Sequence, residues 1–580
     1  MFTMRKFTAD FETTTDANDC RVWAYALSEI GNPSNFIYGN SMDDFMEWCG
    51  DRCHNFELYF HNLKFDGCYI ISWLLSHGFT WIEDRKDRDD LTFTTLITDM
   101  GQFYSIVIYF EAHNKKHVNK ITIKDSLKIL NFSVERIAQD FNLPIQKLSI
   151  DYKAYRPIGH KLTEEEVAYI RNDVEIMSMA LETMFEEGLT KMTIASDALN
   201  DFKERIINFK HFFPELPLEI DQDIRRSYKG GFTYLNPIYQ GLELGAGYVL
   251  DKNSMYPSKM VKELLPVGWP IFFKGKYEYD SIHPLYIQRL TCRFKLKKGK
   301  IPSIQLKNNP SFKPNEYIED SDGELVTLTL CSPDLELFLE NYDVEDIYYE
   351  SGWKFRGMRG LFKNYVEYWT EKKIEAKKNH NGAKYVISKL MLNSLYGRFG
   401  LNPVSRTKRP YLKDGVLKFE VNDIELRKPI YVAMASFITA YARKDIIKSS
   451  ELIREYSLKH YGYDAYVYSD TDSIHCLMKL SDLRSLKNKL HIDDYKLDFW
   501  KIESSFCRAK FLRQKAYIEE GEDGLNVTIA GLPKRLGKYI NFDNFEIGFT
   551  TEGMQIDEHK LSYKQVKGGV LLVDTDFTIK

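Results

Sequence analysis

The chain has 580 residues, of which 44% are hydrophobic and 28% charged, and this balance excludes a disordered or fibrous protein. Its 79 Lys and Arg against 83 Asp and Glu give a formal net charge of −4, which as an average argues against a strongly basic nucleic-acid-binding protein. The eight cysteines follow no disulfide framework, and we see neither a signal peptide nor the ~20-residue apolar run of a membrane span, so we expect a soluble protein of a reducing compartment.

Residues 1–190 alternate between short apolar segments and longer amphipathic ones. Their periodicities predict strands at 6–13 and 57–61 and helices at 66–75 and 163–187. This alternation predicts an α/β domain at the start of the chain.

Carboxylates on these elements form a pattern that suits metal binding. Asp10 and Glu12 lie two residues apart on one strand and therefore share a face. Asp66 lies at the start of a helix, and Tyr169 and Asp173 lie one turn apart on another. Four carboxylates can hold two divalent ions, which would relieve their repulsion and cleave a phosphodiester. Because a single Asp at a helix start usually only caps the helix, it is their combination that predicts a site.

The remaining residues predict a second, larger unit. A glycine-containing break at 227–232 precedes it, and residues 361–397 predict a helical region interrupted near 379–382. Two hairpins are also predicted, a basic one at 406–425 and an apolar one at 466–478.

A second acidic cluster is predicted at the turn of the apolar hairpin. Asp470 and Asp472 flank that turn, and Asp251 follows a short strand elsewhere in the chain. If the turn folds against that strand, the three acids create a site for two Mg²⁺ ions that bridge a triphosphate. A turn of this composition that stands alone is more often a solvated β-turn.

Between these segments lies a helix with groups that suit a nucleotide. Lys389, Asn393 and Tyr396 recur at i, i+4 and i+7 and share one face. A lysine charge suits phosphates, and a tyrosine ring offers a flat wall for a base. The alternative is an amphipathic core helix whose lysine faces solvent.

Charge is distributed unevenly along the chain. Residues 354–413 hold fifteen Lys and Arg and three acids, a net charge of +12, so the other 520 residues sum to −16. Such a run is often a solvated face, but aromatic residues are interspersed in it. Basic and aromatic side chains together favour a polyanion that also offers bases for stacking.

In number and order, these motifs resemble those of family-B DNA polymerases, specifically the protein-primed branch of small phages (phi-twenty-nine type). The resemblance implies an α/β and α+β multidomain fold with an RNase H-like exonuclease domain and a right-hand polymerase of palm, fingers and thumb. The implied domains are the exonuclease at 1–190, the palm at 191–303 and 428–530, a terminal-protein insertion at 304–358, the fingers at 359–397, an insertion for processivity and strand displacement at 398–427 and the thumb at 531–580.

For the exonuclease domain, the resemblance implies that the metal ligands are Asp10, Glu12, Asp66 and Asp173, and that Tyr169 and Lys147 assist catalysis. The implied contacts to a single-stranded 3′ end are Tyr59, His61, Asn62, Phe65, Ser126 and Leu127. The resemblance also implies a linker motif that balances synthesis against degradation. Its residues Tyr228, Gly230 and Gly231 are also assigned to DNA binding.

For the polymerase domain, the resemblance implies that Asp251 and Asp472 bind metal with Asp470 beside them, and that Tyr256 excludes a 2′-OH. The implied nucleotide contacts are Lys389, Asn393, Tyr396 and one of Lys372, Lys373 or Lys377, of which Lys373 is the candidate. Further implied contacts are Lys515 and Tyr517 to the primer strand and Asp334 to the terminal protein.

The implied function is a DNA-directed DNA polymerase with protein-primed initiation, strand displacement and 3′→5′ proofreading, using two-metal phosphoryl transfer at both sites. The implied cofactor is Mg²⁺, two per site, with Mn²⁺ as an alternative. The implied partners are template and primer DNA, dNTPs, a terminal protein and phage single-strand and double-strand DNA-binding proteins. We expect a monomer in the cytoplasm of a bacterial host.

Two alternatives differ in what they predict. A structure-specific nuclease whose second acidic cluster is inactive would incorporate no dNTP on a primed template. A non-enzymatic single-strand-binding protein would bind DNA without Mg²⁺ and turn nothing over, but its bare carboxylates would repel DNA.

Overall fold

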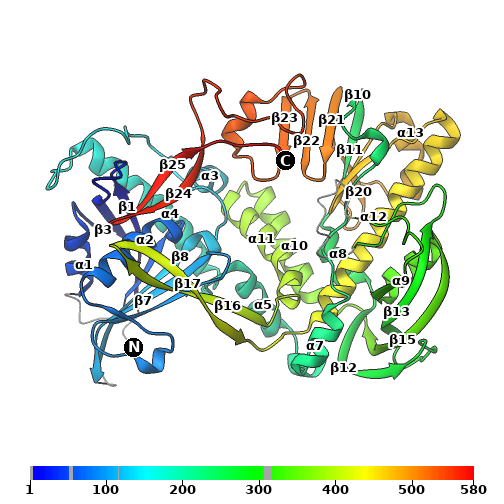
Figure 1. The fold of residues 1–580 in the computed structure, drawn as a ribbon, viewed down its shortest axis with the longest axis horizontal. Coiled ribbons are helices and arrows are strands. Elements are labelled where there is room, and N and C mark those ends of the chain that lie inside the picture. Colours follow the sequence, from blue (N-terminus) through cyan, green and yellow to red (C-terminus); the bar gives the residue numbers. More distant parts are fainter. Residues whose placement is uncertain (1–3, 51–55, 115–116, 306–316) are drawn as a thin grey trace.

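The computed structural model describes residues 4–50, 56–114, 117–305 and 317–580. Two lobes lie side by side (Figure 1), the first built from the N-terminal residues and the second from the middle and later parts of the chain. Helices from the middle of the chain and the C-terminal segment connect them. Across the described ranges, no helix has the length and apolar character needed to cross a membrane.

The N-terminal lobe contains an eight-stranded mixed sheet of order β3-β2-β1-β4-β8-β7-β6-β5. The central strand β1 pairs antiparallel with β2 and parallel with β4, which is also parallel to β8. The strands are β1 (Arg5–Thr13), β2 (Val22–Glu29), β3 (Asn32–Gly39), β4 (Phe56–Phe60), β5 (Thr80–Trp81), β6 (Thr92–Ile97), β7 (Phe103–Asn114) and β8 (His117–Asp125).

Helices in this lobe pack on the sheet and bring further acids to it. They are α1 (Met42–Gly50), α2 (Leu63–Ser76), α3 (Val134–Asp140) and α4 (Glu164–Glu186). A capping box at the start of α4, in which Thr163 and Glu166 bond each other's backbone N–H, fixes where that helix begins. The predicted strands and helices of residues 1–190 are therefore confirmed, with ends shifted by a few residues.

Helices from the middle of the chain join the lobes around the largest hydrophobic core. They are α5 (Ile194–Arg205), α6 (Phe209–Phe212), α7 (Leu218–Arg225), α10 (Lys363–Lys378) and α11 (Gly382–Phe399). The predicted interruption near 379–382 is confirmed, because Asn381 caps α11 by accepting a hydrogen bond from the N–H of Lys384.

The second lobe is centred on a five-stranded antiparallel sheet of order β20-β11-β19-β18-β9. Its strands are β9 (Thr233–Leu235), β11 (Gly247–Lys252), β18 (Tyr466–Asp470), β19 (Ser473–Cys476) and β20 (Trp500–Phe506). The associated helices are α8 (Met255–Lys262), the long α12 (Val432–Tyr461), α13 (Leu480–Ser485) and α14 (Lys487–Leu490).

A four-stranded sheet beside this one crosses a predicted domain boundary. It consists of β12 (Leu265–Lys274), β13 (Leu285–Leu296), β14 (Val326–Cys331) and β15 (Tyr342–Met358), with α9 (Ser332–Asn341) packed on it. The predicted boundary between 303 and 304 therefore separates strands that pair with each other. Part of the predicted insertion, 306–316, lies outside the described residues.

The C-terminal part forms another sheet and two long hairpins. The sheet has β10 (Glu243–Leu244), β21 (Arg508–Arg513), β22 (Ala516–Gly521) and β23 (Gly524–Ile529). One hydrophobic cluster joins β21–β23 to residues 532–579, so the predicted boundary between 530 and 531 also falls inside one core. The hairpins are β16 (Val404–Lys413) with β17 (Val416–Leu426), and β24 (Lys560–Val566) with β25 (Gly569–Thr575).

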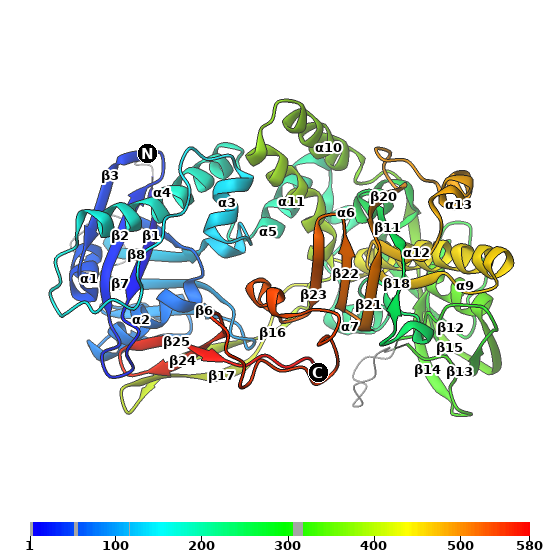
Figure 2. The same cartoon turned by 90° about the horizontal axis from the view of Figure 1, so that it is seen from above.

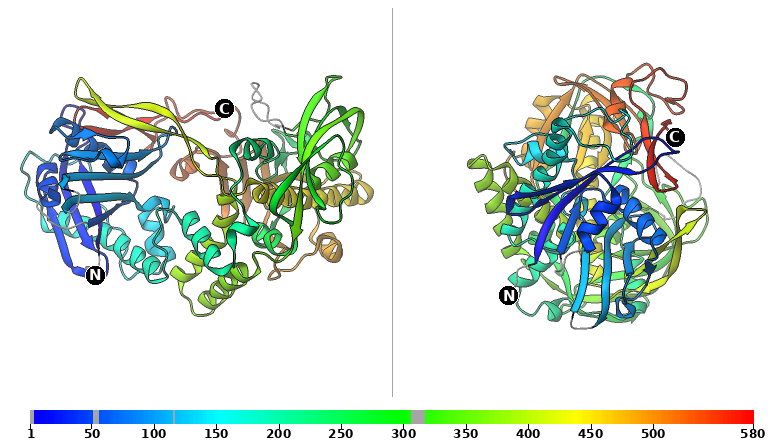
Figure 3. Two further views of the ribbon diagram at one scale, coloured as in Figure 1. Left: turned by 90° about the horizontal axis from the view of Figure 1, so that it is seen from below. Right: turned by 90° about the vertical axis from the view of Figure 1, so that its left-hand side faces the viewer.

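Both hairpins reach back to the N-terminal lobe, where they lie together beside α2 (Figure 2). Seen from below, β16 and β17 extend from the second lobe to the first (Figure 3). The N–H of Asp99 donates to the carbonyl of Arg406 at 3.0 Å, and the hydroxyl of Tyr69 donates to the carbonyl of Val570 at 2.6 Å. The two lobes are thereby connected through segments distant in sequence.

Candidate active sites in the two lobes

The first site lies where β1, α2 and α4 meet. Asp10 and Glu12 come from β1, Asp66 from the first turn of α2 and Asp173 from α4. Glu12, Asp66 and Asp173 are only 8%, 3% and 5% exposed. The structure therefore brings together the four carboxylates that the sequence indicated, in a largely buried setting.

Burial, and then mutual repulsion, raises the pKa values of these carboxylates. Burial raises the pKa of Asp10 to about 7, and the charge of Asp173 adds to the rise. Burial also raises the pKa values of Glu12 and Asp66, with the charge of Asp10 contributing to both. Lys147 opposes this effect, since its Nζ lies 2.5 Å from Asp173 Oδ2. The cluster needs further positive charge to be fully ionised at neutral pH.

The donor atoms fit a divalent metal ion. Oδ1 of Asp66 and Oδ1 of Asp173 are buried and accept no hydrogen bond, which is costly for carboxylate oxygens. Such oxygens are the ligands that Mg²⁺ prefers. Among the residues described, no three acidic, His or Cys side chains converge on one metal position.

Tyr152 is a residue of this site that the sequence analysis missed. Its hydroxyl is hydrogen-bonded to that of Tyr169, and both tyrosines line a cavity of about 680 Å³ with Lys147. The only sequence feature that could have indicated Tyr152 is its position five residues after Lys147. Nothing else in the local sequence distinguishes it from a surface tyrosine.

The predicted contacts to a single-stranded 3′ end are not equally accessible. Tyr59 is 2% exposed and packs in the large core, and Ser126 is fully buried, so these two side chains present little surface to a strand, and their contacts with DNA stay predictions. His61 has both ring nitrogens engaged, one by Ser126 and one by the carbonyl of Phe132. Burial and hydrogen bonding therefore fix the positions of these three side chains beneath the neighbouring surface.

Two of the other predicted contacts lie against the C-terminal hairpin. Asn62 Nδ2 donates to the hydroxyl of Tyr563 on β24 at 3.0 Å, and the rings of Phe65 and Tyr563 are 6.3 Å apart. Leu127, which is partly exposed, donates its N–H to Asp125. The hairpin thus adds an aromatic side chain to the surface next to the acidic cluster.

The second site lies in the five-stranded sheet of the second lobe. Register pairing places Asp251 on β11 opposite Ser473 on β19, one residue after Asp472. Burial raises the pKa of Asp472 to about 6, and the charge of Asp251 adds to the rise. Two half-buried, mutually repelling carboxylates fit a divalent cation, as in the first site.

Asp470 has different surroundings from Asp472 although both flank one turn. Its two carboxylate oxygens each lie 2.9 Å from Lys515 Nζ, and Thr233 and Thr471 donate to Oδ1. Lys515, the predicted primer contact, is thus paired with Asp470, and the Tyr517 ring stacks on Phe511.

An aromatic pair closes one side of this site. Tyr256 on α8 stacks on Tyr396 of α11, with ring centroids 4.0 Å apart and planes 21° apart. A Cβ at Gly231 would lie 2.9 Å from both the Tyr256 hydroxyl and Thr471, so only glycine allows the chain to pass here. Gly230 is not crowded in this way, and Tyr228 lies against Gly400.

Lysines gather beside Asp251. Lys389 and Asn393 are exposed on one face of α11, while Lys373 is half-buried and has its pKa lowered by burial and then by the charge of Lys389. Lys372 is paired with Glu187 instead, so Lys373 is the one that shares the surroundings of Lys389.

Lys501 was missed by the sequence analysis. It is the cross-strand neighbour of Asp251, and its Nζ lies 3.1 Å from Asp251 Oδ2. Its charge also acts on Lys373. No local pattern could indicate it, because β20 and β11 are about 250 residues apart.

Comparison with known proteins identifies the family of this chain. A family model for DNA polymerase type B, organellar and viral, matches residues 52–161 and 155–486. The DNA polymerase of Bacillus phage B103 is 45% identical over 99% of this chain and all of its own length, and that of Bacillus phage phi29 is 42% identical over 99% of each. The chain belongs to the phi29-type family-B DNA polymerases.

Solved structures of the phi29 DNA polymerase share the fold of this polymerase. Its complex with primer-template DNA superimposes with a TM-score of 0.90 at 41% identity, and each chain is covered completely. Its ternary complex with primer-template DNA and incoming nucleotides gives 0.90 at 42% identity. The mixed α/β multidomain architecture of this polymerase is therefore that of its family.

Asp334, the predicted terminal-protein contact of this polymerase, is not at the surface. It is 7% exposed and pairs with Arg443, whose Nη2 lies 2.6 Å from Asp334 Oδ2. Arg443 Nη1 in turn donates to the carbonyls of Lys229 and Gly230, at 2.9 and 2.7 Å. Asp334 is thus linked through Arg443 to the segment 228–231, and its contact with a terminal protein stays a prediction.

Proposed function

We propose that this DNA polymerase elongates a primer in its second lobe and removes mispaired 3′ ends in its first. The observation that supports this most directly is the presence of two acidic centres in separate lobes, one largely buried and one half-buried. Each contains carboxylates with raised pKa values, and each has a lysine in contact with one of them. We further propose an RNase H-like fold for the first lobe and a right-hand arrangement for the second.

In synthesis, Asp251 and Asp472 would hold Mg²⁺, which supplies charge stabilisation to the phosphoryl group being transferred. Lys389 and Lys373 neutralise the triphosphate of the incoming dNTP. Tyr256 lies against the sugar and excludes a 2′-OH, and the primer 3′-OH displaces pyrophosphate from the α-phosphate.

In degradation, Asp10, Glu12, Asp66 and Asp173 would hold the metal ions. Lys147 keeps Asp173 ionised, and Tyr169 orients the water that attacks the terminal phosphodiester. Mn²⁺ is an alternative to Mg²⁺ at both sites. We also propose a terminal protein as the initiating primer, strand displacement during elongation, and auxiliary phage DNA-binding proteins as partners.

Separating the two activities by single substitutions tests this proposal. We expect Asp472→Ala to abolish dNTP incorporation on a primed template and to leave 3′→5′ degradation intact, because the acids lie in different lobes. Asp10→Ala should do the reverse, and Asp494→Ala, an exposed acid of the second lobe, serves as a matched control. Loss of both activities in a folded single variant would refute the two-site assignment.

A further inference from the structure

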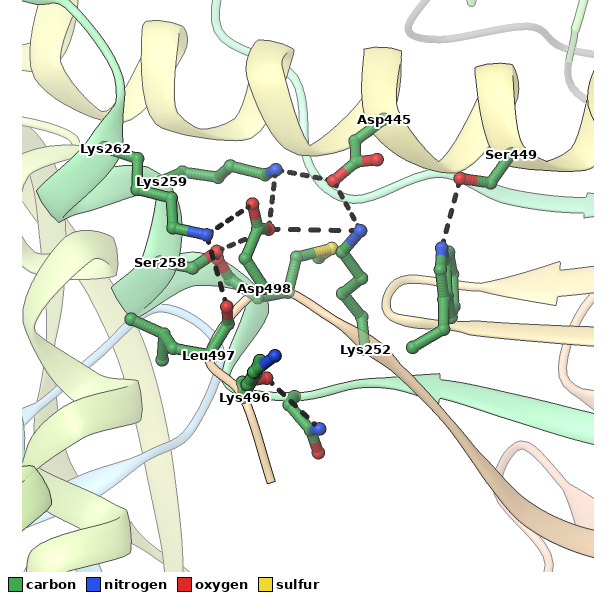
Figure 4. Close-up of polar contacts among 12 residues, drawn as sticks. Lys252, Ser258, Lys259, Lys262, Asp445, Ser449, Lys496, Leu497 and Asp498 are labelled. Carbon is green, nitrogen blue, oxygen red and sulfur yellow. Dashed lines mark hydrogen bonds and ion pairs between the residues drawn. The ribbon is translucent and has the colours of Figure 1, made fainter. Parts of the chain in front are cut away.

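Behind the second site lies an ion-pair network that the catalytic scheme does not use (Figure 4). Lys252, Lys259 and Lys262 converge there on Asp445 and Asp498. The side chains of Lys252 and Lys259 are only 3% and 4% exposed. Lysines are rarely buried this deeply unless carboxylates pair with them.

Lys259, on α8, is the centre of this network. Its Nζ lies 2.5 Å from Asp445 Oδ2 on α12 and 2.8 Å from Asp498 Oδ1. Lys252 Nζ lies 3.0 Å from the same oxygen of Asp445, and Ser258 Oγ donates to Asp498 Oδ1 at 2.8 Å. The network therefore joins the end of β11, helix α8, helix α12 and the segment before β20.

The backbone of that segment is bound to the turn after β11. The N–H of Asp498 donates to the carbonyl of Asn253 at 3.0 Å, and the N–H of Asn253 donates to the carbonyl of Phe499 at 2.9 Å. Asp498 has φ +72°, in the left-handed region that most non-glycine residues avoid and that Asp and Asn tolerate best. Its backbone hydrogen bonds and its ion pairs hold Asp498 in this conformation.

Buried ion pairs add little net stability, because desolvation offsets their attraction, but they restrict how the joined elements can move. Here the restricted element is α8, which carries Tyr256 one helical turn before Lys259. The Tyr396 ring lies on Tyr256. The network thus anchors the short helix that presents the aromatic pair.

We propose that Asp498 and Lys259 are positioning residues for Tyr256, holding α8 so that the tyrosine ring stays close enough to the nucleotide sugar to exclude a 2′-OH. This inference rests on the proposed role of Tyr256. The inference predicts that the network affects the selection of deoxyribose over ribose. A role of the network in folding alone would leave this selection unchanged.

The test compares ribonucleotide with deoxyribonucleotide incorporation, as the ratio of their kcat/KM values on one primed template with Mg²⁺. Asp498→Asn removes the charge and keeps a residue that tolerates the left-handed backbone, and we expect discrimination to fall about tenfold. Ser258→Ala, which loses only a hydroxyl, should shift the ratio in the same direction and carries the test if Asp498→Asn does not fold. Lys496→Ala, an exposed lysine of the same segment, is the matched control.

A double-mutant cycle with Tyr256→Val identifies the route of the effect. If the network acts through the tyrosine ring, Asp498→Asn adds no further loss of discrimination to Tyr256→Val. The inference is overturned if Tyr256→Val weakens discrimination while folded Asp498→Asn and Ser258→Ala leave it unchanged. It is also overturned if the losses of discrimination caused by Tyr256→Val and Asp498→Asn multiply in the double variant. If Tyr256→Val itself has no effect on the ratio, the proposed gate is wrong, and the inference fails with it.

Discussion

At the scale of single residues, identical side chains have different roles because their neighbours differ. Asp470 and Asp472 lie two residues apart, yet Lys515 pairs with Asp470 whereas Asp251 repels Asp472. The partners of each carboxylate therefore come from segments that lie far away in sequence. Asp251 is the clearest case, because Lys501 reaches it from the neighbouring strand.

Removing that lysine should change the pH dependence of synthesis. Burial and Glu503 raise the pKa of Asp251, and Lys501 lowers it. Lys501→Ala should therefore raise the pKa further, and since metal binding needs the ionised carboxylate, the acid limb of the kcat/KM profile should move to higher pH. Primer extension between pH 5.5 and 8 measures this shift. The exonuclease profile should not move, and an unchanged synthesis profile would mean that Lys501 does not act on Asp251.

The buried pair of Asp334 and Arg443 leads to a second prediction. Asp334→Ala leaves Arg443 buried without its carboxylate, a change that typically costs 3–5 kcal/mol. We expect a lower melting temperature and impaired extension from DNA primers as well as from a protein primer, because the linker carbonyls lose their fixed partner. A defect confined to protein-primed initiation, with normal extension of a DNA primer, would instead favour direct contact with the terminal protein.

At the scale of elements, the hairpin of β16 and β17 is a long two-stranded ribbon that depends on other segments for burial. Leu417 is fully buried in the core of the N-terminal lobe, and the Phe419 ring packs edge-on against Phe103. Val416 forms a bridge with Lys567 in the C-terminal hairpin. The hairpin thus connects both ends of the chain to the second lobe.

Deleting residues 406–425 tests what this connection does. If enclosure of the DNA maintains contact during synthesis, the deletion should steeply shorten the product made per binding event, because electrostatic attraction alone is weakened by salt. Addition of the first few nucleotides and degradation of single strands should persist. Primer extension with a heparin trap measures product length, and unchanged length would rule out this role.

At the scale of the whole molecule, the net charge of −4 is an average over unlike parts. The strongly basic stretch 354–413 covers α10, α11 and β16, while part of the acidity is in the two acidic clusters. The lobes are joined by a shared helical core and by the two hairpins, so each acidic centre keeps its own surroundings within one connected molecule.

By itself, the sequence determined the local elements and the chemical types at each site. Strand alternation, helix caps and turn residues act over a few positions, so the predicted strand, helix and hairpin at Asp10, Asp66 and Asp470 were found close to their predicted bounds. The order of the motifs also indicated the family.

Only the tertiary structure decided which of these side chains are accessible and what each one pairs with. Tyr59 and Asp334 are buried, Lys501 faces Asp251, and a sheet crosses the predicted boundary at 303. The physical reason is that burial, desolvation and ion pairing depend on contacts between segments that are often more than a hundred residues apart, and local sequence patterns do not record such contacts.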